Sequence, residues 1–198
     1  MKERVSIKRI LIDLMSIKEQ VKLFFKEDDK YHVLIKYILE DERLNNEDLY
    51  LPTFKEIEKQ TGIKVYHIRK QLKEIYDKMF DFENGHVFSF PKTEIWFNAK
   101  NNGKHLAFKC IRLNHIPRIG ENMDLPFIKS KLGSDYFYVH DIRHWFSSDL
   151  HTIDIYLKRG FFNSYWYHRL HEAKEKRELP FNDFYDLPEY ELKGRLIK

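Results

Sequence analysis

The sequence predicts an α+β protein in which a helical amino-terminal part is followed by a small antiparallel β part. Two observations predict this fold class. Apolar residues up to about position 80 recur every three or four residues, the spacing that places them on one side of a helix. From residue 93 onward, short runs of alternating apolar and polar residues are separated by Asn-Gly, Pro and Gly, which is typical of antiparallel strands.

Composition and charge limit the possible functions. The 198 residues are 42% hydrophobic and 16% aromatic, which is enough for a real core. The 35 basic residues nearly balance the 31 acidic ones, so any binding to nucleic acid must be argued from where the charge lies. The single cysteine, Cys110, excludes an internal disulfide and is typical of a reducing compartment. Charges interrupt residues 1–20 every few positions, and we therefore expect a cytoplasmic protein with no membrane partner.

Residues 1–29 are predicted to form a leading amphipathic helix. Its apolar side chains alternate at spacings of three and four, which gives one continuous stripe. The stripe consists of Ile7, Ile10, Leu14, Ile17, Val21 and Phe24. Two roles remain open for it: packing on the protein's own next domain, or forming the seam of a homodimer.

Residues 30–92 are predicted to form a second helical domain. After a first helix and a polar loop, Thr53 and Glu56 have the spacing of a capping box, in which each side chain bonds the other's backbone N–H. Gly62 then ends this second helix, because a left-handed residue favours a side chain without Cβ. A third helix is expected over residues 64–78. The order helix, helix, tight turn, helix is that of a helix-turn-helix.

The third helix leaves a basic face exposed. At 100° per residue, its apolar residues share one sector, and the opposite side of its early turns carries cations and hydrogen-bond donors. These residues are Tyr66, His67, Arg69, Lys70 and Lys73. Such side chains reach phosphates or pair with guanine edges. The alternative is a merely solvated helix surface, where charge normally lies.

A hairpin is predicted directly after the third helix. In "DFENGHVFSF", residues 81–90, the pair Asn84-Gly85 lies between apolar residues, which is the strongest short hairpin signal. A hairpin at this place would be the wing of a winged helix-turn-helix.

Residues 51–80, "LPTFKEIEKQTGIKVYHIRKQLKEIYDKMF", resemble the DNA-binding domain of GntR-type winged helix-turn-helix transcription regulators. The family's opening Leu-Pro-Ser matches Leu51-Pro52-Thr53, its Gly-Val turn matches Gly62-Ile63, and its Val-Arg-x-x-Leu segment matches residues 68–72. The resemblance implies that Arg69 contacts DNA. Two departures stand out: Lys64-Val65 replaces the common Ser-Arg, and Glu58 occupies a place where a small residue usually lets the helices approach.

Residues 93–180 are predicted to form a small antiparallel β domain, barrel-like or a curled sheet, with a carboxyl-terminal helix. Two strands are expected around Asn102-Gly103, two more between residues 135 and 160, and a short extended run before them. The helix would begin near Asn163 or Ser164, and residues 181–198 would form a tail lying along a surface or remaining mobile. This domain does not resemble the effector domains of the GntR family.

Neither catalysis nor a cofactor is indicated. The pairs His140/His144 and His168/His171 fall short of the three or four ligands that zinc needs, and no Gly-rich phosphate loop or nucleophile elbow is present. The aromatic run of residues 161–167 is expected either to be core or to form a pocket for a protein or small ligand.

We therefore expect a two-domain, bacterial-type cytoplasmic regulator that binds double-stranded DNA as a homodimer through its amino-terminal helix. Base edges would be contacted by Arg69, Tyr66 and His67. The other expected DNA-binding residues are Thr53, Lys64, Lys70, Lys73 and His86. The three lysines and His86 would hold phosphates. The alternatives are a protein-interaction or scaffold module built on a winged helix, and an RNA-binding protein whose β domain stacks bases.

Overall fold

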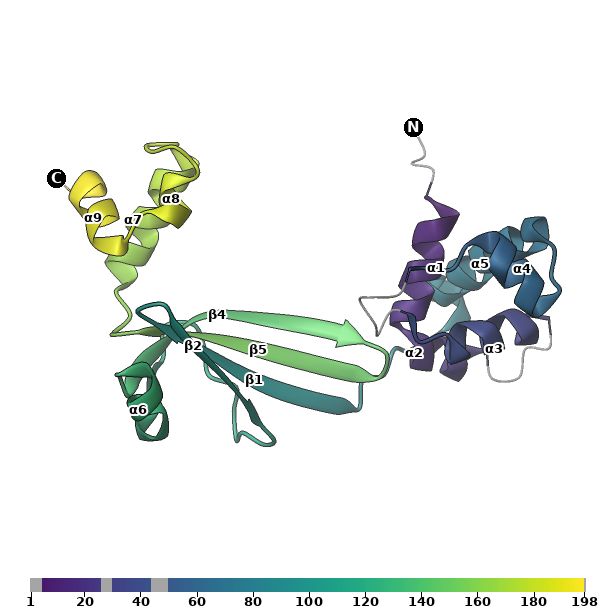
Figure 1. Cartoon of the computed structure of the whole chain (residues 1–198), viewed down its shortest axis with the longest axis horizontal. Coiled ribbons are helices and arrows are strands. Elements are labelled where there is room, and N and C mark those ends of the chain that lie inside the picture. The colour runs from purple at the N-terminus through teal and green to yellow at the C-terminus, as the bar shows by residue number, and fades with distance from the viewer. Residues whose placement is uncertain (1–4, 26–29, 44–49, 198) are drawn as a thin grey trace. The chain divides into compact units, whose positions relative to one another are not determined.

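The computed structural model describes residues 5–25, 30–43 and 50–197, and combines helices with an open sheet, as the α+β prediction requires (Figure 1). The chain divides into two compact units. The amino-terminal unit comprises Met1–Glu94 with His144–Ile153, and the carboxyl-terminal unit comprises Ile95–Arg143 with Asp154–Lys198. The contribution of residues 144–153 to the first unit was not expected.

The helices of the amino-terminal unit surround one core. They are α1 (Ile7–Ser16), α2 (Lys18–Phe24), α3 (His32–Glu40), α4 (Phe54–Thr61) and α5 (Val65–Met79). α1 packs against α5, whereas α2 packs against α3. The predicted single leading helix is therefore interrupted at Ile17, which has φ −126° and ψ 41°, and its two halves pack mainly on different helices. Part of the predicted range, residues 1–4 and 26–29, lies outside the described chain.

The apolar stripe of the leading segment belongs to the chain's own core. Leu14 and Val21 are fully buried, Ile10 is nearly so, and Ile7, Ile17 and Phe24 pack partly buried against the same cluster. Of the two roles that the sequence left open, packing on the next domain is the one that the structure shows. A dimer seam would have to use another surface.

The second and third predicted helices form as the local signals indicate. Thr53 Oγ1 accepts from the N–H of Glu56 at 3.3 Å, and a Glu56 carboxylate oxygen accepts from the N–H of Thr53 at 2.7 Å, which completes the capping box. Gly62 follows α4 with φ 73°, the left-handed conformation expected of it. Ile68, Leu72, Ile75 and Met79 of α5 are buried.

The predicted hairpin around Asn84-Gly85 is absent from residues 81–90, all of which the structure describes, so this part of the prediction was wrong. Residues Phe82–Asn84 form a 3-10 turn capped by Asp81, whose carboxylate accepts from the N–H of Glu83 at 3.1 Å. Phe88 packs into the helical core, while Phe82 is 98% exposed and so cannot pair with it across a hairpin. After Gly85, His86 and Phe88 instead pack against the helices of this unit.

The strands of the described chain are β1 (Lys92–Asn101), β2 (Lys104–Cys110), β3 (Asn122–Asp124), β4 (Tyr136–Ser147) and β5 (Leu150–Arg159). Their order is β2-β1-β5-β4-β3, with β1 pairing antiparallel to β2 and β3 to β4. The sheet is open rather than barrel-like, because the two edge strands, β2 and β3, are not neighbours. The Asn102-Gly103 turn is confirmed, since Asn101 pairs with Lys104 across it.

One face of the sheet in the carboxyl-terminal unit is apolar and buried. Strands β1, β4 and β5 place on it residues that alternate with polar ones, namely Ile95, Phe97, Ala99, Phe137, Val139, Ile155 and Leu157. The short helix α6 (Lys129–Leu132), which follows the 3-10 turn Pro126–Ile128, contacts β2. The buried side-chain amide of Asn101 donates to the carbonyl of Leu132 at 2.7 Å and ties this helix to the β1–β2 turn. The opposite face stays partly open.

The carboxyl-terminal residues are folded, contrary to the predicted surface-lying or mobile tail. Helix α7 (Ser164–Glu175) begins at Asn163, whose side chain accepts from the N–H of Trp166. It forms an apolar cluster with α8 (Asp183–Asp186) and α9 (Glu189–Leu196). Trp166, Phe184, Leu192 and Leu196 are buried there. In the aromatic run 161–167 only Trp166 is buried, because the other rings face the sheet edge or solvent. No helix in the described ranges has the length and apolar character needed to cross a bilayer.

Candidate nucleic-acid interface

The turn between α4 and α5 positions the candidate face. Gly62 N–H donates to the carbonyl of Glu58 at 2.9 Å, and Thr61 Oγ1 accepts from the N–H of Ile63 at 3.2 Å, so the turn is held by its backbone and by the Thr61 side chain. Burial of Ile57 and Ile68 on the facing sides of the two helices then fixes which side of α5 remains outside. The exposed side of α5 carries the residues that the sequence singled out.

Arg69 is held in place by an aromatic ring. Its guanidinium carbon lies 5.1 Å from the ring centre of Phe54, the first residue of α4. This cation–π contact orients the side chain without neutralising it. Arg69 is exposed and has no ion pair with any residue that the structure describes. Its charge is therefore available to an external anion.

The three lysines of this face differ in their surroundings. Lys73 is exposed and, within residues 5–25, 30–43 and 50–197, makes no ion pair. Lys64 lies 3.4 Å from a carboxylate oxygen of Glu58, the residue that the family resemblance marked as unusual. Lys70 lies 4.0 Å from Glu74. Both lysines are exposed and both carboxylates are partly exposed, and ion pairs at the surface add little stability, so they can exchange for phosphate contacts at little cost.

Tyr66 and His67 form the aromatic part of the face. Tyr66 is 71% exposed, and its ring meets the His67 ring edge-on at 5.5 Å between centres. The phenol hydroxyl and the imidazole nitrogens can donate and accept hydrogen bonds at base edges. The structure thus brings Lys64, Tyr66, His67, Arg69, Lys70 and Lys73 together at the start and on the outer side of α5.

Two predicted site residues have other roles in the structure. The hydroxyl of Thr53 is engaged in the cap of α4, where the backbone N–H of Thr53 also lowers the pKa of the Glu56 carboxyl. His86 stacks on Phe24, with 4.4 Å between ring centres and 13° between planes, and is half-buried. Because the expected hairpin is missing, His86 lies against α2 instead of at the tip of a wing.

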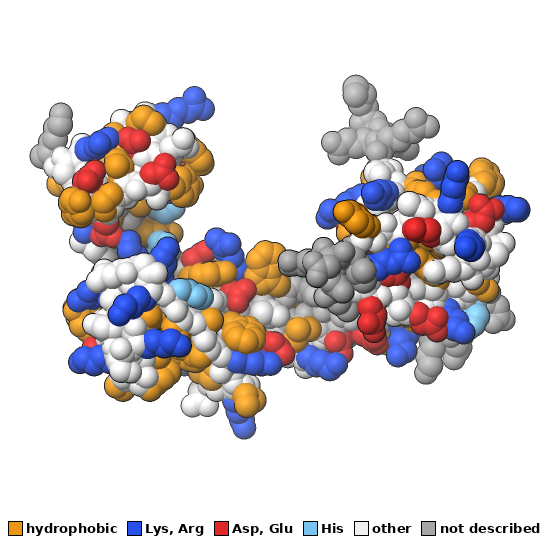
Figure 2. All heavy atoms as spheres, viewed as in Figure 1, with side chains coloured by type: hydrophobic (Ala, Val, Ile, Leu, Met, Phe, Trp, Pro, Cys, Tyr) orange, Lys and Arg blue, Asp and Glu red, His pale blue; other side chains and the backbone are white. Residues whose placement is uncertain are grey.

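Two further lysines were missed by the sequence reasoning. Lys55 and Lys59 lie one turn apart on the outer side of α4, are exposed, and make no ion pair within the described part of the chain. Their i, i+4 spacing was the signal that could have identified them. Figure 2 shows lysine and arginine side chains spread over the visible side of this unit with acidic side chains between them, so positive charge is not a property of this whole surface.

Glu74 anchors the other side of α5. One of its carboxylate oxygens accepts from Lys30 Nζ at 2.6 Å and from Tyr31 Oη at 2.9 Å. These two hydrogen bonds, in that order of importance, hold the pKa of the Glu74 carboxyl below its ordinary value. Glu74, which lies 4.0 Å from Lys70 of the basic face, is thus engaged mainly with two residues just before α3.

No family model, curated protein or solved structure matches this chain. The resemblance of residues 51–80 to GntR-type regulators therefore stays a prediction that its residues alone support.

The histidines do not gather into a metal site in the described chain. No group of three or more histidine, cysteine, aspartate or glutamate side chains with ligand geometry occurs there. His144 instead contacts His151, with 2.8 Å between Nδ1 and Nε2, and His171 lies against the ring of Tyr167. His168 also contacts the ring of Tyr167, so neither predicted pair is arranged around a shared metal position.

Proposed function

We propose that the amino-terminal unit binds double-stranded DNA by inserting α5 into the major groove, and that the protein regulates transcription. The observation that carries the proposal is the pair Arg69 and Lys73. Both are exposed on a helix whose opposite side is buried, and neither has a carboxylate partner in the described chain. Unpaired cations on the outer face of the second helix of a helix-turn-helix are suited to phosphates and to guanine edges.

The proposed roles follow from side-chain chemistry. Arg69, oriented by Phe54, would read a guanine through its two parallel donors, while Tyr66 and His67 contact neighbouring base edges. Lys64, Lys70 and Lys73 would hold phosphates. The lysines of α4 would extend this contact along the backbone of the duplex.

The domain would be a helix-turn-helix of α3, α4 and α5 extended by α1 and α2, without the hairpin wing of the GntR-type regulators that it resembles. His86 would then make no phosphate contact, because its ring is stacked on Phe24. The affinity for DNA would then come from the helices alone. A second copy of the domain, bound to the same DNA, would therefore contribute more to binding. We propose a homodimer that reads two half-sites about one helical turn apart, with an interface other than the buried stripe of α1 and α2.

One observation favours a protein-interaction role as the second candidate. Phe80, Phe82 and Val87, which follow α5, are 53%, 98% and 77% exposed, respectively. Exposed apolar side chains that are close together in the sequence are suited to a protein partner. In a scaffold protein this surface would bind the protein partner, and that binding would not depend on the basic face of α5.

The test compares Arg69→Ala and Lys73→Ala, singly and together, with the matched control Lys8→Ala/Arg118→Ala, which removes one lysine and one arginine elsewhere. Fluorescence anisotropy with sheared genomic duplex DNA is measured over a range of salt concentrations, after circular dichroism has confirmed folding. We expect Lys73→Ala to lower the slope of log K against log salt by about one. Arg69→Ala is expected to cost about 1–3 kcal/mol and to relax sequence preference in selection from a random duplex library.

Equal binding by the double variant, the control and the wild type would overturn the α5 assignment. Tighter binding of single-stranded RNA than of duplex DNA would favour the RNA alternative. Absence of any salt-dependent affinity in the wild type would leave the Phe80–Val87 surface as the functional one.

A further inference from the structure

The open face of the sheet in the carboxyl-terminal unit holds a cavity of about 630 Å³ near the β1–β2 turn. This volume is within the range of about 300–1,000 Å³ that is typical of small-molecule sites. Strands β1, β2, β4 and β5 all contribute side chains to it. It is therefore built by the sheet itself and by residues far apart in the sequence.

Strand register explains which side chains meet there. Lys100 pairs with His105 across β1 and β2, so both point to the same side of the sheet. On β5, Tyr156 and Lys158 share this side, because the alternate residue Ile155 points into the core. Leu157 and Arg159 alternate with them and line the cavity where β5 ends. His140 reaches the cavity from β4.

The charge of the lining is one-sided. Lys100, Lys158 and Arg159 line the cavity together with the two histidines, and none of the described carboxylates lines it. Lys158 is paired with Glu189 of α9, whereas Lys100 and Arg159 have no ion pair in the part of the chain that the structure describes. Figure 2 shows histidine side chains between lysine and arginine side chains over this part of the molecule. Two unneutralised cations at a concave site favour an anionic ligand.

An aromatic ring and amides complete the site. Tyr156 lines the cavity, and the guanidinium carbon of Arg143 lies 5.1 Å from its ring centre. Asn98 also lines the cavity, and its amide nitrogen is 3.4 Å from Asp154. A flat ring beside hydrogen-bonding amides and cations is the combination that binds a planar ring joined to phosphate.

We propose that this cavity binds a free nucleotide, with its phosphate on Lys100 and Arg159 and its base against Tyr156. A small ligand fits better than a polymer. Asp154 shares the open side of β5 with Tyr156, and Glu189 lies against Lys158, so negative charges border the cavity where a longer strand would have to continue. The site is in the carboxyl-terminal unit, and the proposal holds whether or not α5 binds DNA.

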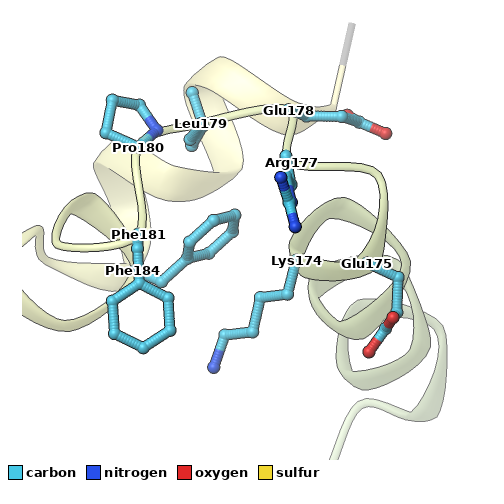
Figure 3. Close-up of a pocket in the computed structure, with 8 residues that line it drawn as sticks. All are labelled: Lys174, Glu175, Arg177, Glu178, Leu179, Pro180, Phe181 and Phe184. Atoms are coloured by element: carbon cyan, nitrogen blue, oxygen red, sulfur yellow. The ribbon is translucent and has the colours of Figure 1, made fainter.

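A second cavity is a weaker candidate for an anionic ligand than the sheet site, because its lining carries both signs of charge. It lies among α7, α8 and the loop between them and has a volume of about 830 Å³ (Figure 3). Its lining mixes Lys174 and Arg177 with Glu175 and Glu178, and Figure 3 shows Lys174 extending toward Phe184. Cations and carboxylates are equal in number among these described residues, so the larger cavity has no preference for the sign of a ligand.

The experiment titrates the full-length protein with ATP as the probe, using isothermal calorimetry at low salt. The variant Lys100→Ala/Arg159→Ala is compared with Lys131→Ala/Arg118→Ala, which removes the same two residue types outside the cavity. We expect saturable ATP binding by the wild type and the control, and at least about tenfold weaker binding by the cavity variant, a difference of about 1.4 kcal/mol. Tyr156→Leu is expected to weaken ATP binding without changing the affinity for inorganic phosphate.

Three results would overturn the proposal. The first is no saturable ATP binding by the wild type. The second is equal ATP affinity of the cavity variant and the control, with both folded by circular dichroism. The third is displacement of ATP by a long oligothymidylate that binds more tightly than ATP, since the ligand would then be a strand and not a free nucleotide. None of these readouts depends on duplex binding by α5, which Arg69→Ala and Lys73→Ala test separately.

Discussion

At the residue scale, Gln20 shows how one polar side chain joins distant segments of the amino-terminal unit. It is only 1% exposed. Its amide nitrogen donates to the carbonyl of Ser148 at 2.9 Å and also to that of Ser89, whose N–H donates back to the Gln20 oxygen at 3.0 Å. Since a buried polar group is costly unless it is bonded, these contacts fix the chain before β1 and the β4–β5 turn against α2. In the sequence, Gln20 is merely a polar position on a helix.

Glu74 gives a pH-dependent prediction at the same scale. Because hydrogen bonds from Lys30 and Tyr31 lower its pKa in the folded protein, the carboxylate stabilises the fold above its ordinary pKa of 4.5. That stabilisation is lost as the pH falls through the lowered folded-state pKa. We expect Glu74→Gln to be less stable than the wild type at neutral pH, with the difference shrinking in acid, as measured by urea unfolding across pH 2–7.

The control for this prediction is Glu42→Gln, an exposed carboxylate that has no ion pair in the described residues. We expect its stability difference from the wild type to be small. If the unfolding curves of Glu74→Gln and the wild type kept the same separation at every pH, the hydrogen bonds from Lys30 and Tyr31 would not lower the pKa of the Glu74 carboxyl.

At the element scale, signals that act over a few residues predicted the ends of α4 and the β1–β2 turn well. The capping box of Thr53 and Glu56, the left-handed Gly62 and the Asn102-Gly103 turn depend on neighbours in the chain, and each is found. The Asn84-Gly85 hairpin failed although its local signal was equally strong. Phe88 packs against Phe24 and Phe80, and burial of that ring in the helical core outweighs pairing with the exposed Phe82.

Leu14→Glu tests the position of α1. Leu14 is completely buried in the helical core, so a carboxylate there would be desolvated without a partner. We expect a loss of about 4 kcal/mol or more in the free energy of unfolding, at the upper end of single substitutions. Chemical denaturation followed by circular dichroism measures it.

Lys8→Glu, on the exposed side of the same helix, serves as the matched control and should change stability by less than about 0.5 kcal/mol. A Leu14→Glu protein that stays fully stable but changes from dimer to monomer in analytical ultracentrifugation would instead show that the stripe is a seam between copies.

At the scale of the whole molecule, the amino-terminal unit is completed by a segment from far along the chain. Residues His144–Ile153 belong to it. Ser148 N–H and Ser147 Oγ both donate to the carbonyl of Ser16 at the end of α1, at 2.8 and 3.2 Å. A helix end leaves such carbonyls unsatisfied unless other groups bond them, so this turn acts as a cap that the local sequence lacks.

A fragment of residues 1–94 should therefore be less stable than the same unit in the full chain. It lacks the partners of the Ser16 carbonyl and one of the partners of Gln20. We expect faster amide hydrogen exchange in α1 and α2 of the fragment, with a smaller change in α5. Identical protection of α1 and α2 in both proteins would mean that residues 144–153 contribute nothing to the unit.

The amino-acid sequence alone was enough to predict the α+β class, the α4–turn–α5 arrangement, the β1–β2 turn and the basic face of α5, because periodicity, caps and turns act between neighbouring residues. Four outcomes required the folded structure: the leading stripe is core, the wing is absent, the tail folds on α7, and the sheet stays open. They depend on competition for burial between segments far apart in the chain, such as Phe88 with α2 and Phe184 with α7. The same long-range pairing places Lys100 and Tyr156 beside one cavity, which no local pattern indicates.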